Sequence, residues 1–132
     1  MLTAEQLRAR NWWQGPQLFL LVDDYDLVAT GQNPLTALLD FIGHAGDIGL
    51  HLVLARRTGG AARTAFEPIM LRLRELGSPG IVMSGSRDEG VLLGNVRAAA
   101  QPPGRGWLVD RQHGTRLVQL AWQPPPEFSE SS

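Results

Sequence analysis

The sequence predicts an α/β fold with a mainly parallel sheet and a C-terminal β-hairpin. Two runs, residues 17–22 and 50–55, are apolar at consecutive positions, which is typical of strands covered by helices on both faces. Segments with helical spacing follow both runs, as expected for parallel strands joined by crossovers. Two further strand-like runs, 107–109 and 116–121, flank a turn at residues 112–114 and predict the hairpin.

The N-terminal elements are indicated by a capping pattern and a turn. Thr3 and Gln6 have the spacing of a capping box, with Leu2 placed as a staple, and predict a short helix over residues 4–11. Trp12 and Trp13 precede a Gly-Pro turn. We expect one of them to be a buried anchor and the other a partly exposed ring; the alternative is an aromatic patch that binds a partner.

The middle of the chain alternates helices and strands. Asn33 as N-cap and Pro34 at the first position predict a helix through Ile42. A long helix is expected over residues 61–76, kinked or split at Pro68, and a third strand over residues 80–83. After this strand, we expect Asp88 to cap a short turn that runs to Leu93, followed by a loop over residues 95–105. The whole is predicted to be a single domain over residues 1–123, followed by a disordered Pro-rich and acidic tail over residues 124–132.

Composition excludes several classes of function. The net charge of −1 argues against a nucleic-acid binder, and the absence of cysteine excludes disulfides and thiolate metal sites. The longest apolar run, Leu18–Val22, is far too short to insert into a membrane. All 12 basic residues are arginine, so the chain cannot form a complete P-loop or a lysine Schiff base.

Charged residues end both apolar strands, where ligands bind in parallel sheets. Asp23 and Asp24 follow the first strand in the manner of a Walker B motif, in which the first acid holds Mg²⁺ and the next can polarise water; a solvated strand end is the alternative. Arg56 and Arg57 follow the second strand and could bind phosphate, reach into a neighbouring subunit or pair with those acids.

The histidines do not indicate a metal site. His44, His51 and His113 lack the spacing of metal ligands. His51 alternates within an apolar strand, so we expect a hydrogen-bonded core residue. An apolar groove for a peptide helix could be lined by a scattered set of large side chains, each of which could equally belong to the core: Trp12, Trp13, Leu92, Leu93, Trp107 and Trp122.

The order of these motifs over residues 4–123 resembles the FtsK/SpoIIIE-type ATPase domains, and more narrowly the C-terminal ATPase domain of the EccC family of type VII secretion motors. The segments that carry the resemblance are LFLLVDDYDLVA, NPLTALLDFIGHAGDIGLHLVLARRTGGAAR, LRLRELGSPGIVMSGSRDEGVLLG, PPGRGWLV and RLVQLAW. It implies a RecA-like three-layer sandwich, of which this chain has only the half from Walker B onward.

The resemblance also implies roles for individual residues. Asp23 matches the Walker B acid that binds Mg²⁺, and Asp24 stands where active members carry a longer catalytic glutamate. Arg56 and Arg57 replace a sensor segment that contains glutamine. The cofactor implied is Mg-ATP, and the missing P-loop leaves open whether this chain binds it.

The resemblance further implies a cytoplasmic protein attached to a membrane-embedded secretion complex. It predicts a degenerate ATPase domain that binds the C-terminal signal of EsxB-like (WXG100) substrates, or neighbouring EccC domains, rather than hydrolysing ATP alone. The alternative is half of a hydrolysing site, completed in trans by a chain that carries a P-loop. Neither specific nucleic-acid binding nor direct membrane insertion is expected.

Overall fold

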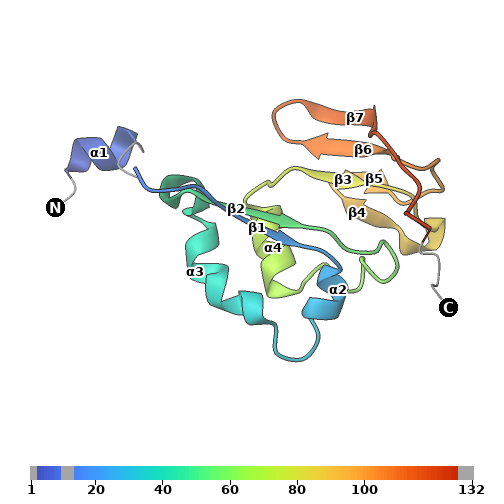
Figure 1. Cartoon of the computed structure of the whole chain (residues 1–132), viewed down its shortest axis with the longest axis horizontal. Coiled ribbons are helices and arrows are strands. Elements are labelled where there is room, and N and C mark those ends of the chain that lie inside the picture. Colours follow the sequence, from blue (N-terminus) through green and yellow to red (C-terminus); the bar gives the residue numbers. More distant parts are fainter. Residues whose placement is uncertain (1–2, 10–13, 128–132) are drawn as a thin grey trace.

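The computed structural model describes residues 3–9 and 14–127 and consists of two groups of strands with helices beneath one of them (Figure 1). The elements, in chain order, are α1 (Ala4–Ala9), β1 (Leu18–Val22), α2 (Tyr25–Val28), η1 (Pro34–Leu38), α3 (Leu39–Ile42), η2 (Ala45–Ile48), β2 (Leu50–Leu54), α4 (Pro68–Glu75), β3 (Gly80–Val82), η3 (Arg87–Glu89), β4 (Val91–Leu93), β5 (Val96–Arg97), β6 (Arg105–Asp110) and β7 (Gly114–Gln119), where η marks a 3₁₀ helix.

Strands β1 and β2 form a parallel pair with helices packed on one face. The register runs from Leu18 opposite Leu50 to Val22 opposite Leu54. Alternate residues of both strands, including Leu20 and Leu52, pack against the core under the sheet. The buried centre of that core consists of Tyr25, Leu35, Ile42 and Ile69.

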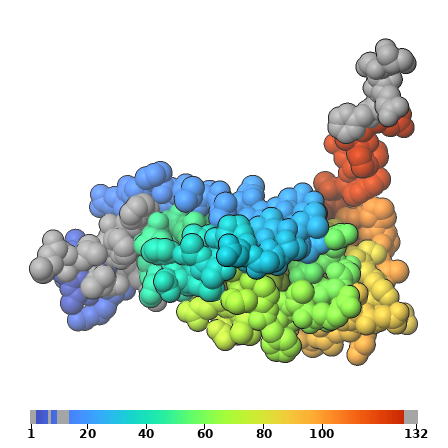
Figure 2. Space-filling model, turned by 90° about the horizontal axis from the view of Figure 1, so that it is seen from below, coloured from blue at the N-terminus to red at the C-terminus, as the bar shows by residue number. Residues whose placement is uncertain are grey.

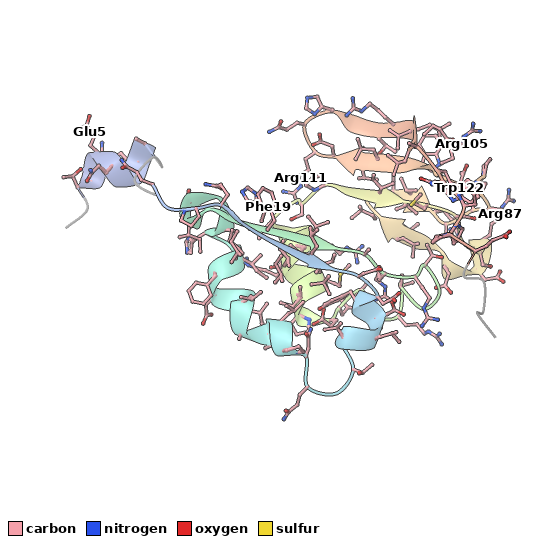
Figure 3. The ribbon with its side chains drawn as sticks, in the orientation of Figure 1. Glu5, Phe19, Arg87, Arg105, Arg111 and Trp122 are labelled. Atoms are coloured by element: carbon pink, nitrogen blue, oxygen red, sulfur yellow. The ribbon has the colours of Figure 1, made fainter. Side chains whose placement is uncertain are left out.

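The opposite face of β1–β2, which we call the open face, is not covered by any described element. Its apolar side chains are Phe19, Leu21 and Val53, which are 62%, 71% and 53% exposed. Phe19 projects from β1 on the side away from α3 (Figure 3). The described residues therefore form two layers of the expected three-layer sandwich, with the remaining face apolar as in a sheet that helices cover on both sides.

His51 lies on this open face, so its predicted place in the core was wrong. Its ring stacks on Phe19 with centroids 4.3 Å apart, and its Nε2 is 2.8 Å from Oε1 of Gln17. The predicted hydrogen bond is therefore present, but on the exposed side of the strand.

The second group of strands is antiparallel. β3 pairs with β6, and β6 pairs with β7 in the predicted hairpin. β4 and β5 form a separate two-stranded ribbon, where the sequence predicted a turn and a loop. Parallel pairing is thus confined, among the described strands, to β1–β2 and a single bridge between Ser84 and Ala99. β3 takes β6 as its neighbour instead of β2.

The predicted helix over residues 61–76 is helical only from Pro68 onward, so the expectation of one kinked helix or two helices was wrong for residues 61–67. Only α4 is helical, with Pro68 at its first turn and Glu67 as N-cap, whose side chain accepts from the Met70 amide. Residues 61–67 form turns, and Phe66 is 79% exposed instead of lying on a helix face.

The other capping predictions mostly hold. Thr3 and Gln6 exchange the two hydrogen bonds of a capping box, while Leu2, Trp12 and Trp13 lie outside the described residues. Asn33 caps η1 through the Leu35 amide, although the predicted helix is divided into η1 and α3. Ser86, and not Asp88, caps the turn η3.

The C-terminal segment leaves the hairpin and extends from the body of the protein (Figure 2). Residues 121–127 contain no helix or strand. The last five residues of the predicted tail, 128–132, lie outside the described part of the chain.

Candidate functional site

The acidic cluster (Asp23, Asp24 and Asp26) lies where β1 ends, as the sequence predicts. The Tyr25 amide donates to the Ala55 carbonyl at 2.8 Å, which holds this loop against the loop that follows β2. Asp23 and Asp24 are exposed, and Oδ1 of Asp23 accepts from the Asp24 amide at 2.9 Å. Both carboxylates are therefore available to a ligand at the carboxyl end of the parallel pair.

Asp24 has a left-handed backbone, with φ 49° and ψ 45°. It is the only residue other than glycine with positive φ among residues 3–9 and 14–127. Aspartate tolerates this region better than most residues because its short side chain can bond locally, but a cost remains. The backbone thus turns sharply at the predicted water-orienting position.

Arg57 pairs with Asp26, and not with Asp23 or Asp24. Its Nη2 and Nε both lie 2.8 Å from Oδ2 of Asp26, and its amide donates to Oδ1 at 3.3 Å. The hydrogen bond from the Arg57 side chain is the main reason that the pKa of Asp26 lies below its ordinary value. The arginine is 71% exposed and the aspartate 11%, so the pair lies at the rim of the site.

Arg56 is held within its own loop. Its Nη1 donates to Oγ1 of Thr64 and its Nε donates to the Arg57 carbonyl. Arg56 and Arg57 line an open cavity of about 580 Å³, which we call the first cavity. Its other lining residues are Thr58, Gly59, Met83 and Ser84.

The first cavity lies between the segments that follow β2 and β3. Thr58 Oγ1 donates to the Ser84 carbonyl at 3.2 Å and joins the two segments. Gly85 permits this approach, because a Cβ there would lie 2.8 Å from the Thr58 hydroxyl oxygen. Two arginines and exposed polar groups at the strand ends make this cavity suited to an anionic ligand.

A partly buried network of three side chains, which the sequence did not reveal, holds the start of α2 directly after Asp23 and Asp24. The Tyr25 hydroxyl donates to Oε2 of Glu67 at 2.7 Å and accepts from Nδ2 of Asn33 at 2.8 Å. Asn33 also donates to Oε1 of Glu67 at 3.0 Å. Since Tyr25 begins α2, and Asn33 and Glu67 are the N-caps of η1 and α4, the network ties the end of β1 to the starts of η1 and α4.

The network changes the pKa of both ionisable members. Burial, followed by the hydrogen bond to Glu67, raises the pKa of Tyr25 well above its ordinary value. For Glu67, partial burial acts to raise the pKa, but the hydrogen bonds from Tyr25, the Met70 and Ile69 amides and Asn33 outweigh it and lower the pKa. The pair is therefore a neutral phenol bonded to a carboxylate.

The remaining candidates do not gather at this site. The described residues contain no group of three histidine, aspartate or glutamate side chains that could hold a metal ion, and no helix in this part of the chain is long and apolar enough to cross a bilayer. Of the predicted groove residues, Trp107 is half-buried opposite Val82 and Trp122 is 57% exposed. Leu93 lines a separate cavity at the other end of β3.

Comparison with known proteins finds close similarity to one kind of protein, although no family model matches. The chain is 57% identical over 122 residues to the ESX secretion system protein EccC of Thermomonospora curvata, covering 92% of this chain and 9% of that protein. It is also 57% identical over 122 residues to the ESX-4 secretion system protein EccC4 of Mycobacterium tuberculosis, covering 92% and 10%.

Comparison with solved structures also finds EccC proteins. A solved structure of Thermomonospora curvata EccC, containing ATPases 2 and 3 in complex with a signal sequence peptide, matches with a TM-score of 0.86 and 55% identity. The match covers 95% of this chain and 22% of that one. The chain thus spans about a tenth of the length of the curated relatives that it matches.

Proposed function

We propose that this chain is the later half of a RecA-like domain of a type VII secretion motor. The support is its match, in sequence and in fold, to a segment of the EccC secretion proteins. In this role it binds the C-terminal signal of EsxB-like substrates or neighbouring motor domains, on the cytoplasmic side of a membrane-embedded complex. Alone, it does not hydrolyse ATP.

The main observation behind the lack of ATP hydrolysis is that the acidic cluster is present while the sequence has no P-loop to bind the phosphates. Asp23 has one carboxylate oxygen on its neighbour's amide and the other available. Mg²⁺ in nucleotide sites uses one or two carboxylates together with substrate phosphates. The acidic side therefore fits Mg-ATP, but a phosphate loop needs a lysine and this sequence has none.

The residues that would contact nucleotide follow from this partial fit. Asp23 would supply the Mg²⁺ ligand, Asp24 would orient water, and Arg56 and Arg57 would face the phosphates across the first cavity. Arg57 would first have to leave Asp26, which adds a cost to phosphate binding. Peptide binding requires none of these groups, and EccC from Thermomonospora curvata has been solved with a signal sequence peptide.

Titration with a synthetic peptide that copies the last 25 or so residues of an EsxB-like protein tests the proposal. A ligand that binds only the folded state raises the melting temperature, and the rise grows with the logarithm of ligand concentration once that concentration exceeds Kd. We expect stabilisation by the peptide, equal in wild type and Asp23→Ala, and none by Mg-ATP. Absence of any peptide effect at several hundred micromolar would reject the binding role.

A second candidate is half of a hydrolysing site that another chain completes. The open face favours it, because Phe19, Leu21 and Val53 present to solvent the kind of surface that a further layer normally covers. Mixing this chain with the P-loop half of an EccC domain should then produce Mg-dependent ATP hydrolysis. Asp23→Ala should abolish that activity, and a mixture that remains inactive would reject this candidate.

A further inference from the structure

A second cavity, of about 260 Å³, lies at the opposite end of β3 from the first. Three segments meet there: the end of α4 with the turn that follows it, the end of β4, and the end of β6. The lining residues are Arg74, Gly77, Ser78, Leu93, Gly94, Val109 and Arg111. The first cavity lies at the other end of β3, next to Met83 and Ser84, and the two cavities share no lining residue.

Glycine at position 77 makes this cavity possible. Gly77 ends α4 with φ 69°, and its amide and that of Ser78 return to the Arg74 and Leu73 carbonyls. The Arg111 side chain crosses directly over it, because a Cβ at Gly77 would lie 2.4 Å from Arg111 Cδ. Arg111 comes from the hairpin turn and is labelled in Figure 3.

The guanidinium of Arg111 is positioned by the end of α4. Its Nη2 lies 3.5 Å from the Arg74 carbonyl oxygen and 3.4 Å from that of Glu75. These are the last carbonyls of the helix, where a cation is favourable. One nitrogen is thereby used, and the others are not hydrogen-bonded to any described residue.

Arg74 adds a second positive charge to the cavity. Within residues 3–9 and 14–127, neither Arg74 nor Arg111 has a carboxylate within 4.0 Å, whereas Arg72, two positions before Arg74, pairs with Glu75. Arg74 is only half-exposed, so its charge lies in a partly enclosed position. Next to these two charges, Leu93 and Val109 give the cavity an apolar wall.

We propose that the second cavity is a subsite for a peptide segment that presents a carboxylate next to an apolar side chain. The carboxylate pairs with Arg74 and Arg111, and the apolar side chain packs on Leu93 and Val109. The volume is just below the range of about 300–1,000 Å³ typical of small-molecule sites, so it accepts one or two side chains and leaves the rest of the peptide outside.

This subsite rests on the proposed peptide-binding function and gives it a location. A free phosphate would satisfy the arginines but would leave the apolar wall in contact with water. A peptide side chain satisfies both halves of the cavity, which is why the observations favour a peptide over an inorganic anion.

The first experiment measures the affinity of the EsxB-like signal peptide for variants of the full chain by fluorescence anisotropy. Arg74→Gln removes one charge without breaking any hydrogen bond of that side chain, and we expect affinity to fall about fivefold. Arg72→Gln, two positions from Arg74 along α4 but outside the cavity, is the matched control and should bind as wild type does. Equal binding by wild type and Arg74→Gln would overturn the subsite while leaving peptide binding intact.

A second measurement separates the subsite from the proposed function. Acetyl-Leu-Glu-Leu-amide is titrated into ¹⁵N-labelled chain, and we expect shifts at the Gly77, Ser78 and Gly94 amides. Such shifts, in a chain that does not bind the long peptide, would retain the subsite and reject the signal-binding role. Shifts of the same size with inorganic phosphate, or no shifts with acetyl-Leu-Glu-Leu-amide, would reject the peptide subsite.

Discussion

Replacing Tyr25 with phenylalanine removes one oxygen atom beneath the acidic cluster and leaves the ring in place. The Tyr25 side chain is fully buried, so the ring contacts of the core remain unchanged. The Glu67 carboxylate then keeps the Met70 amide and Asn33 as donors but loses its 2.7 Å bond from the phenol. The change therefore removes both hydrogen bonds of the phenol, the one that it donates to Glu67, 42 positions away, and the one that it accepts from Asn33 Nδ2 at 2.8 Å.

The expected cost is set by the charge on the acceptor. Hydrogen bonds to charged groups contribute about 1.5–3 kcal/mol, and no cavity is created, so we expect Tyr25→Phe to lower the free energy of unfolding by about 2 kcal/mol. For a chain of this size the melting temperature should fall by roughly 8 °C. Asn33 Nδ2 loses its bond to the phenol but retains its bond to Glu67, so the carboxylate loses only one of its donors.

The assay is urea unfolding followed by tryptophan fluorescence, on wild type, Tyr25→Phe, Glu67→Gln and the double variant. If the phenol acts through the carboxylate, Tyr25→Phe should cost about 1 kcal/mol less in the Glu67→Gln background than in wild type. A Tyr25→Phe effect below about 0.5 kcal/mol, or one that is identical in both backgrounds, would refute the reasoning.

The same network predicts a dependence on pH. Because the pKa of Glu67 is lower in the folded chain than its ordinary value of 4.5, folding is favoured by the ionised carboxylate. Its contribution is complete above pH 4.5 and is lost as the pH falls through the folded pKa. The stability difference between wild type and Tyr25→Phe should therefore shrink as the pH falls from 4.5 through the folded pKa of Glu67.

Three further predictions test local features of the fold. Asp24→Asn should leave the free energy of unfolding within about 0.5 kcal/mol of wild type, whereas Asp24→Val should lower it by about 1–2 kcal/mol because of the left-handed backbone; urea unfolding measures both. Leu21→Glu should fold normally and bind less of the dye ANS, while Leu20→Glu, which places a charge in the core, should not fold by circular dichroism. Gly85→Ala should cost about 1–3 kcal/mol in thermal unfolding, since its Cβ would meet Thr58, whereas at Gly46 an added Cβ meets nothing within 4 Å and the cost should be below about 1 kcal/mol.

Features with local causes could be predicted from the sequence. Asn33 and Pro34 mark the start of η1 because the cap needs only a side chain and the amide two positions later. The two charged clusters fall at the same edge because parallel strands end together. Pro68 begins α4 because proline fits the first turn of a helix, although residues 61–67, which were also expected to be helical, form turns.

Features that depend on distant residues could not be predicted. Glu67 is the partner of Tyr25, and no sequence pattern links positions 42 apart. Pairing of Arg57 with Asp23 or Asp24 was one of three possibilities that the sequence left open. Its partner is instead Asp26, which follows the left-handed turn at Asp24. β5 lies in a stretch with loop composition, and its pairing with β4 comes from tertiary context.

The uneven spacing of strand partners has a consequence for how the chain folds. The β6–β7 hairpin closes over a three-residue turn, while Leu18 and its partner Leu50 in the parallel pair are 32 positions apart. Since local contacts form faster than distant ones, the hairpin should become ordered early and the parallel strands late. Until then the apolar strands remain accessible to other molecules, so the yield of refolding from denaturant should decrease as protein concentration rises.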